Sequence, residues 1–114
     1  MKRQEPDDCG FGTALNVIGG KWKSTILWEL NLKPCRFGEL RRLIPGITEK
    51  VLMQQLREME GHGIVQRTVL PGAPPRVQYS VTEFGTTLNE AVSAMARWGK
   101  RYEQFAYRQA AIGM

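Results

Sequence analysis

Apolar side chains recur every three to four residues along the first half of the chain, a spacing that predicts a series of amphipathic helices. The predicted helices cover residues 11–18, 21–31, 36–44 and 49–60. Glycine or proline follows each of them, at Gly19, Pro34, Pro45 and Gly61, and these residues favour a break in a helix. The first half of the chain is therefore expected to be a set of short helices.

The pattern changes after Gly63, where β-branched residues alternate with polar ones over 64–70 and again over 76–81. This period of two predicts a pair of strands. The connection, PGAPP, excludes a tight two-residue turn, so we expect a stiff projecting loop. Thr82 can then cap a long final helix, whose apolar residues lie near heptad spacing. That stripe, which the core of a small domain is too short to cover, comprises Leu88, Ala91, Val92, Met95, Trp98, Tyr102 and Phe105.

The predicted order is four helices, two strands and a helix, with only a Pro-Gly turn between the third and fourth helices. Two short helices joined by a tight turn and followed by a hairpin are typical of a winged helix-turn-helix. The expected fold is therefore mainly α with a small β wing, formed by one domain over residues 1–114.

The fourth helix carries two stripes. Leu52, Leu56 and Met59 form the apolar one, which is expected to face the core. The opposite stripe comprises Lys50, Met53, Gln54 and Arg57. An α-helix fits the major groove of DNA, where arginine pairs with guanine, glutamine with adenine, and an apolar group contacts the thymine methyl. The outward stripe is thus either a base-reading surface or an ordinary solvated helix face.

The start of this helix offers two further candidates. Thr48 is a predicted N-cap, and the free N–H groups beside it favour a phosphate. Glu49 is interpreted either as an acceptor for cytosine or as a partner of the helix dipole.

Four basic residues are candidates for contacts with the DNA backbone. Arg67 lies on the first strand and Arg76 follows the proline pair, so each can reach the minor groove or its phosphates from a projecting hairpin. The alternative for Arg76 is a salt bridge within the hairpin. Lys23 and Arg36 are the favoured helix contacts, because each opens a predicted helix where the backbone can approach DNA.

Composition supports a polyanionic partner. The formal net charge is +5, with a sequence pI near 9.6. No apolar run approaches the roughly 20 residues of a membrane span, and the N-terminus lacks the apolar stretch of a secretory signal, so a cytoplasmic protein with no membrane partner is expected. Two cysteines and a single histidine cannot complete a zinc site, and no nucleophile-base pair or phosphate-binding glycine loop is present. We therefore expect neither a cofactor nor an enzyme.

Four ordered blocks carry a family resemblance: IGGKWK, RFGELRRLIPGI, LMQQLREME and PPRVQYSVTEFG. Together they resemble the HxlR family of bacterial winged helix-turn-helix regulators, which are related to the MarR group. The blocks lie within residues 9–98, and residues 99–114 extend the last helix. The resemblance implies a homodimer whose first and last helices form the interface, with Phe11, Leu15, Leu88, Val92, Met95, Trp98 and Tyr102 as candidates.

The resemblance also implies a function: sequence-specific binding of double-stranded DNA at a pseudo-palindromic operator. Such regulators commonly repress by blocking polymerase, although the resemblance admits activation as well. The alternative is a winged-helix module that binds protein, which predicts an acidic or apolar exposed helix instead of the basic one seen here.

Two features bear on an effector. Cys9 matches a position at which some family members sense oxidants or electrophiles, but Gly10 follows it where proline is common, and an inert thiol is the alternative. Trp22, Trp28 and Trp98 are interpreted mainly as core residues, with an aromatic pocket for a small molecule as the alternative.

Overall fold

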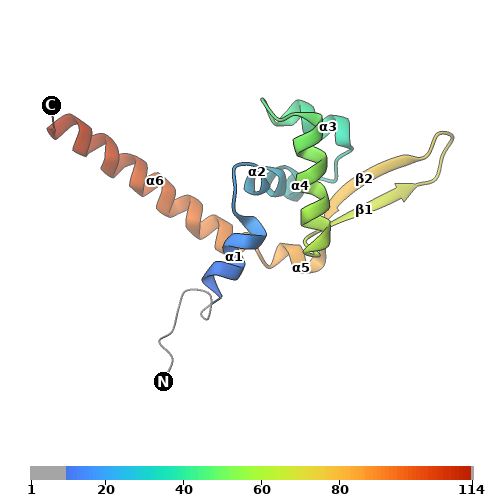
Figure 1. The fold of residues 1–114 in the computed structure, drawn as a ribbon, viewed down its shortest axis with the longest axis horizontal. Coiled ribbons are helices and arrows are strands. Elements are labelled where there is room, and N and C mark those ends of the chain that lie inside the picture. Colours follow the sequence, from blue (N-terminus) through green and yellow to red (C-terminus); the bar gives the residue numbers. More distant parts are fainter. Residues whose placement is uncertain (1–9, 114) are drawn as a thin grey trace, which may run out of the picture.

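A computed structural model describes residues 10–113. Its elements are α1 (Phe11–Ile18), α2 (Lys23–Leu32), α3 (Phe37–Leu43), α4 (Glu49–Gly61), β1 (Val65–Leu70), β2 (Arg76–Val81), α5 (Glu83–Thr86) and α6 (Asn89–Ile112). Figure 1 shows α2, α3 and α4 gathered in the body of the molecule, the hairpin projecting from one side and α6 from the other. The predicted fold, mainly α with a small β wing, is confirmed, and the bounds of α1 to α4 and of both strands lie within two residues of those predicted.

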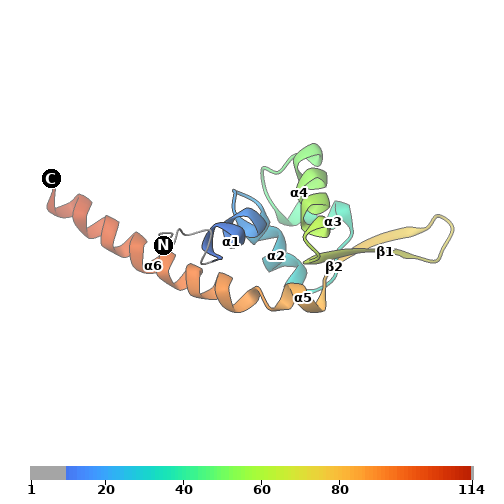
Figure 2. The same cartoon turned by 60° about the horizontal axis from the view of Figure 1, so that its bottom comes forward.

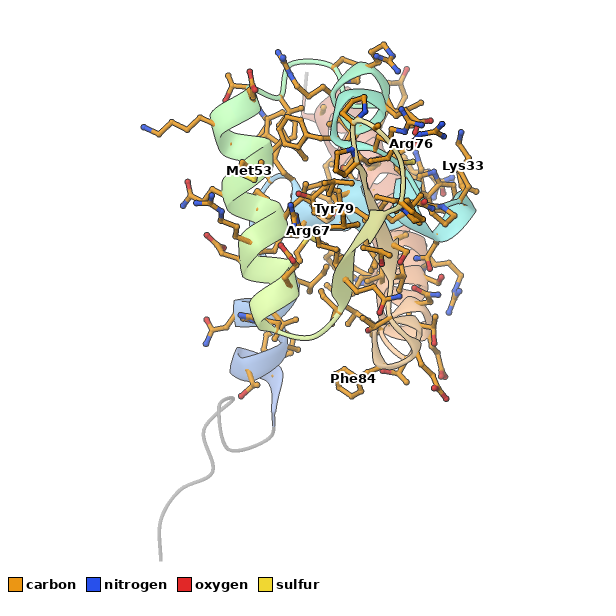
Figure 3. All side chains as sticks on the ribbon, turned by 90° about the vertical axis from the view of Figure 1, so that its right-hand side faces the viewer. Lys33, Met53, Arg67, Arg76, Tyr79 and Phe84 are labelled. Carbon is orange, nitrogen blue, oxygen red and sulfur yellow. The ribbon has the colours of Figure 1, made fainter. Side chains whose placement is uncertain are left out.

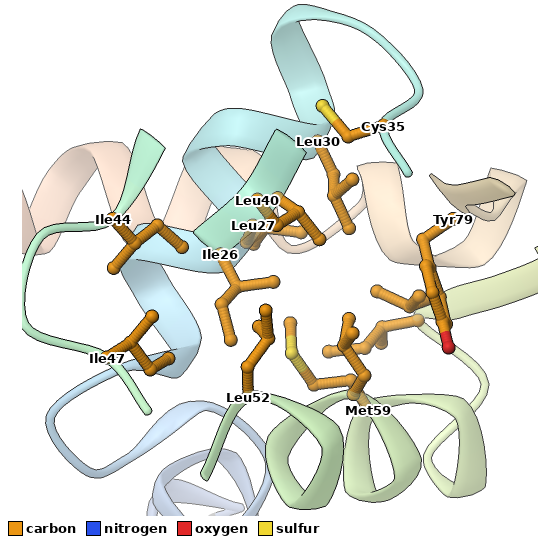
Figure 4. Close-up of a cluster of buried hydrophobic side chains, with 13 residues drawn as sticks. Ile26, Leu27, Leu30, Cys35, Leu40, Ile44, Ile47, Leu52, Met59 and Tyr79 are labelled. Atoms are coloured by element: carbon orange, nitrogen blue, oxygen red, sulfur yellow. The ribbon is translucent and has the colours of Figure 1, made fainter. Parts of the chain in front are cut away.

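The core forms where α2, α3 and α4 meet the base of the hairpin (Figure 4). Most of its fully buried side chains come from the apolar faces of α2, α3 and α4, which the helical period predicted. They include Ile26, Leu27, Leu40, Ile44, Leu52, Leu56, Met59 and Ile64. Tyr79 closes the core from β2. Because α4 buries only its apolar stripe, its opposite side remains free.

The turn between α3 and α4 depends on glycine. Gly46 has a φ of 85°, in the left-handed region that side chains disfavour. The ring of Trp22 lies close to this turn, since a Cβ at Gly46 would be 3.9 Å from its outermost carbon. Trp22 is half-buried against the core, which agrees with its interpretation as a core residue. The orientation of α4 relative to α3 is thus held by a backbone conformation and an aromatic contact.

The hairpin is antiparallel, with Val65 opposite Val81 and Leu70 opposite Arg76. This register leaves residues 71–75 as the connecting loop, so the predicted absence of a two-residue turn is confirmed. An isolated bridge between Cys35 and Tyr79 attaches β2 to the segment that precedes α3. The wing is therefore tied to the helical body through its second strand.

The final helix differs from the prediction. Instead of one helix from Thr82 onward, a short α5 precedes α6. Thr82 caps α5, where its Oγ1 accepts the N–H of Gly85 at 2.9 Å. The hydroxyls of Thr86 and Thr87 donate to the carbonyl oxygens of Glu83 and Phe84, and such local bonds compete with continuation of a helix. The chain consequently turns before Asn89 and begins a new helix.

The molecule is elongated. Its radius of gyration is 17.5 Å, against about 13 Å for a compact domain of 100 residues. Figure 2 shows that α6 and the hairpin account for this shape, because they point in opposite directions from the body. Only the first turns of α6 pack on the core, through Leu88 just before the helix and Val92 within it. Most of α6 therefore does not pack on the core formed by residues 10–113.

Candidate nucleic-acid interface

The site begins at the start of α4. Oγ1 of Thr48 accepts the N–H of Val51 at 3.1 Å, so Thr48 is the N-cap of this helix. Because Oγ1 uses a lone pair for that bond, its hydrogen remains available to donate to an anion. Glu49 lies in the first turn, where a carboxylate interacts favourably with the helix dipole, and its Oε2 is 3.8 Å from a guanidinium nitrogen of Arg41. The positive charge of Arg41 partly offsets the negative charge of this carboxylate.

The outward stripe forms one surface. Lys50, Gln54 and Arg57 are exposed and Met53 is half-buried, as their spacing predicted. Together with Glu58 they line one shallow hollow on the helix. Sequence analysis did not include Glu58 in the site, although its position four residues after Gln54 on the same face was a signal for it.

Lys23 requires a correction. It was predicted to contact a phosphate because it opens a helix, and it does begin α2. However, its side chain is only 8% exposed, and its Nζ lies 2.6 Å from Oε1 of Glu58. The ammonium group is therefore directed into the protein and engaged by α4, so we withdraw Lys23 from the proposed backbone contacts.

Glu58 receives two hydrogen bonds. In addition to Lys23, it accepts the Nε2 amide of Gln54, which lies 3.3 Å from Oε2. The hydrogen bond from Lys23, followed by its positive charge and the bond from Gln54, lowers the pKa of the Glu58 carboxyl. The carboxylate is thus held in the ionised form and acts only as an acceptor.

The wing places its two arginines on opposite faces. Side chains alternate along a strand, so Arg67 shares a face with its partner Tyr79, whereas Arg76 shares the other face with Leu70. Arg67 lies on the side of α4, because it lines a groove together with Met53 of that helix; both side chains are labelled in Figure 3. A groove runs between α4 and this face of the wing, lined by Phe37, Met53, Arg57, Glu60, Arg67, Val77 and Tyr79.

Arg76 is exposed at the first position after the proline loop. Figure 3 places it on the side of Lys33 rather than that of α4. Among residues 10–113 no salt bridge includes Arg76, which removes the alternative of an ion pair within the hairpin. Arg67 and Arg76 are therefore separate candidates for contacts with different parts of a duplex.

Arg36 is the N-cap residue of α3 and is exposed. Its backbone N–H donates to Oε1 of Glu39 at 3.0 Å, and this bond, followed by a hydrogen bond from Lys33, lowers the pKa of the Glu39 carboxyl. The bond concerns the backbone of Arg36 alone. Arg36 borders a surface hollow together with Gly38, Glu39 and Arg42.

The residues predicted at a dimer interface fall into two groups. Phe11 and Leu15 on α1 are about half exposed, and Met95, Trp98 and Tyr102 on α6 are each more than half exposed. Phe105, which continues the apolar stripe of α6 but was not predicted at the interface, is more than half exposed as well. Trp98 and Tyr102 stack with ring centroids 5.5 Å apart. Leu88 and Val92, in contrast, pack against the core of their own subunit, which leaves less of their surface for a partner.

The tryptophans also require a correction. Trp28 and Trp98 are 66% and 58% exposed, so neither is a core residue of the subunit. Trp28 borders a cleft between α2 and α6 with Leu27, Asn31, Asn89 and Val92. The interpretation as core residues failed because a helical period shows which face is apolar and cannot show whether the same subunit covers it.

The structure describes one of the two cysteines, Cys35. Cys9 lies outside the described residues. Cys35 is fully buried, and burial, followed by the nearby charge of Glu39, raises the pKa of its thiol. Between residues 10 and 113 no cluster of three or more histidine, cysteine, aspartate or glutamate side chains is arranged to hold a metal ion. None of the helices in that range combines the length and apolar character that crossing a bilayer requires.

Comparison with known proteins agrees with this geometry. The family model described as HxlR-like helix-turn-helix matches residues 17–107. The chain is 44% identical over 101 residues to the HTH-type transcriptional regulator YkvN of Bacillus subtilis, covering 89% of this chain and 86% of YkvN. Over 94 residues it is 46% identical to YybR of the same organism, covering 82% of this chain and 75% of YybR.

Solved structures give the same result. A MarR-family transcriptional regulator from Enterococcus faecalis V583 superposes with a TM-score of 0.78 at 41% identity, over 88% of this chain and 91% of that one. The redox regulator HypR in its oxidised form superposes with a TM-score of 0.76 at 46% identity, over 82% and 96%. With its helix-turn-helix, its wing and relatives at this level of identity, the chain belongs to the HxlR-like helix-turn-helix family of transcriptional regulators.

Proposed function

We propose that this protein is a sequence-specific DNA-binding transcriptional regulator that acts as a homodimer. One observation carries the proposal: α4 buries its apolar stripe completely and presents Lys50, Met53, Gln54 and Arg57 together on the opposite side. A helix held in this way can enter the major groove without losing its packing. The family membership supports the same function, because the relatives are HTH-type transcriptional regulators.

The contacts divide by chemistry. Arg57 and Gln54 carry bidentate hydrogen-bonding groups suited to guanine and adenine, and Met53 offers an apolar contact to thymine. Lys50 and the hydroxyl of Thr48 are suited to the phosphate at the start of the helix, with Glu49 either reading cytosine or acting on the helix dipole. Arg67, in the groove between α4 and the wing, is placed for a backbone that runs between them. Arg76 at the wing and Arg36 at α3 complete the proposed phosphate contacts.

The apolar surface that residues 10–113 leave exposed supports the proposed homodimer. A contiguous aromatic stripe on a projecting helix is costly in water, and a second copy offers an identical stripe to cover it. We propose that α1 and α6 form this interface, mainly through Phe11, Leu15, Met95, Trp98 and Tyr102. Two α4 helices related by a twofold axis then fit a pseudo-palindromic operator, with half-sites about one helical turn or a multiple apart.

We propose that the regulator responds to oxidants and represses transcription. Two structural neighbours are named for redox behaviour or diamide treatment, HypR and the regulator YodB from B. subtilis, and Cys9 is the thiol that we propose for such a response here. Binding over a promoter would repress by excluding polymerase. The proposed location is the cytoplasm, where bacterial promoters lie.

The test separates base reading from backbone binding. Operator sequences are first selected from a random duplex pool by the wild-type protein. Arg57→Ala and Gln54→Ala should each reduce discrimination at one base position by about 1–3 kcal/mol, whereas Arg36→Ala should weaken all duplexes alike and lower the salt slope by about one. Fluorescence anisotropy at several salt concentrations measures both effects.

Equal losses on every duplex from all three variants would contradict this division. Failure of the wild-type protein to prefer any selected sequence over random duplex would contradict the function itself. The alternative function, a winged-helix module that binds protein, lacks support from the charge of the outward stripe. A protein with that function would bind DNA with an affinity that does not depend on the DNA sequence.

A further inference from the structure

Glu58 joins the buried interior to the base-reading surface. It lies on α4 one turn after Gln54, and its two carboxylate oxygens have different partners. Oε1 lies 2.6 Å from Nζ of Lys23, which comes from α2, while Oε2 lies 3.3 Å from Nε2 of Gln54. One carboxylate therefore connects a residue of the helical body to a residue of the outward stripe.

Lys23 fixes one side of this connection. Its side chain is buried, and α2 around it supplies the fully buried Ile26 and Leu27. A buried ammonium group requires a charged partner, because leaving it unpaired costs several kcal/mol. Glu58, whose side chain is 42% exposed, is the charged partner of this ammonium group. The position of the carboxylate is thus set by the core rather than by solvent.

The carboxylate of Glu58 restricts the orientation of the Gln54 amide. An amide side chain has one end that donates and one that accepts, and rotation by 180° exchanges them. Since an ionised carboxylate only accepts, Gln54 must direct its nitrogen toward Glu58. The amide oxygen and the second N–H then remain available on the outer surface. This pair matches adenine, which offers a donor at N6 and an acceptor at N7.

We infer that Glu58 is a specificity-determining positioning residue: anchored by the buried Lys23, it holds the amide of Gln54 in the one orientation that reads a base. This inference rests on the proposed function, because it assigns a role within base reading by α4. Glu58 itself needs no contact with DNA. Its carboxylate would repel phosphates, and the ammonium of Lys23 offsets that charge.

The decisive variant is Glu58→Gln. A glutamine at this position has a single oxygen, for which Lys23 and Gln54 compete. With that oxygen bound to Lys23, its NH₂ group faces Gln54, whose amide must rotate. Discrimination at the base that Gln54→Ala identifies should therefore fall about threefold to tenfold, the range expected for loss of one oriented hydrogen bond. Glu103→Gln on α6 removes the same charge from an exposed site and should leave discrimination unchanged.

A double-mutant cycle distinguishes positioning from general destabilisation. If Glu58 acts through Gln54, Glu58→Gln should have no further effect on discrimination in a Gln54→Ala background. A second variant, Lys23→Met combined with Glu58→Met, removes the ion pair without leaving an unpaired charge and should show the same loss at that base. Circular dichroism melting verifies that each variant is folded before its binding is compared.

Folded variants that discriminate as well as the wild type, while Gln54→Ala does not, would overturn the inference and leave the proposed function intact. The inference would also be overturned if Glu58→Gln lowered discrimination equally in the wild-type and Gln54→Ala backgrounds. A wild-type protein that selects no sequence would overturn both proposals together.

Discussion

Cys35 shows how strongly the surroundings of one side chain set its chemistry. It lies between α2 and α3, its backbone N–H and carbonyl both bond to Tyr79, at 3.0 and 2.8 Å, and its side chain has no exposed surface. Burial raises the pKa of its thiol. The thiolate is the form that reacts with oxidants. Cys35 is therefore protected, because its side chain is inaccessible and its thiol stays protonated.

The two thiols should therefore respond differently to an oxidant. After treatment of the folded protein with diamide, we expect Cys35 to remain reduced and Cys9, the proposed sensor, to be oxidised with a change in operator affinity. Alkylation of the remaining free thiols followed by mass spectrometry measures both sites at once, and Cys9→Ser provides the control. Operator binding that persists while Cys9 stays reduced would remove the redox proposal.

Lys23 and Glu58 mark the limit of inference from single residues. A lysine that opens a helix is usually solvated, and nothing local identifies Lys23 as buried. Its partner lies 35 residues along the chain, and only the packing of α4 on α2 brings the two together. The outward stripe of α4, in contrast, needed only helical spacing and a buried opposite face, both of which sequence provides.

At the scale of elements, the packing of α5 against the base of the wing depends on a close approach that only glycine permits. Gly85 is buried in α5, and a Cβ at this position would lie 2.2 Å from the carbonyl oxygen of Ile64 and 2.8 Å from a methyl of Val81. Gly85 therefore sets how closely α5 packs against the base of the wing. Sequence analysis predicted a continuous helix here because the apolar period continues through the break.

Gly85→Ala should destabilise the protein by about 1–3 kcal/mol, since the backbone of Ile64 must move to admit the methyl group. Urea unfolding followed by circular dichroism gives the free energy of unfolding. Gly61→Ala at the end of α4 is the matched control: a Cβ there meets nothing within 4 Å, so its stability should be unchanged or higher by up to about 1 kcal/mol. Equal stability of the two variants would show that α5 does not depend on this approach.

At the scale of the whole molecule, α6 is the feature that the subunit alone does not explain. It contains 24 residues, and its exposed stripe of Met95, Trp98, Tyr102 and Phe105 continues far beyond the core. Tyr107, which lies nine residues or about two and a half turns after Trp98, falls on the opposite side of the helix from Trp98 at 3.6 residues per turn. The helix therefore has one aromatic face suited to a partner and one that is suited to solvent along most of its length.

Trp98→Arg should convert the proposed dimer into a monomer, because a charge would be buried opposite its own copy. Loss of the second half-site contact should then weaken operator binding by at least about a hundredfold. Sedimentation velocity and anisotropy measure the two effects. Tyr107→Arg adds the same charge on the other face and should leave both unchanged; a Trp98→Arg variant that remains dimeric would place the interface elsewhere.

The sequence by itself determined the elements and their faces: four helices, the wing, the apolar stripe that α4 buries and the polar stripe that it presents. These follow from spacing along the chain, which is a local property. Tertiary structure alone decided that Lys23 pairs with Glu58, that Arg67 and Arg76 lie on opposite faces of the wing, that Trp28 and Trp98 are exposed, and that α5 separates from α6. The ion pair, the pairing of the two strands and the exposure of the tryptophans depend on which distant surfaces meet, and a period along the chain contains no information about that. The break between α5 and α6 depends on hydrogen bonds of the Thr86 and Thr87 hydroxyls, which the apolar period does not show either.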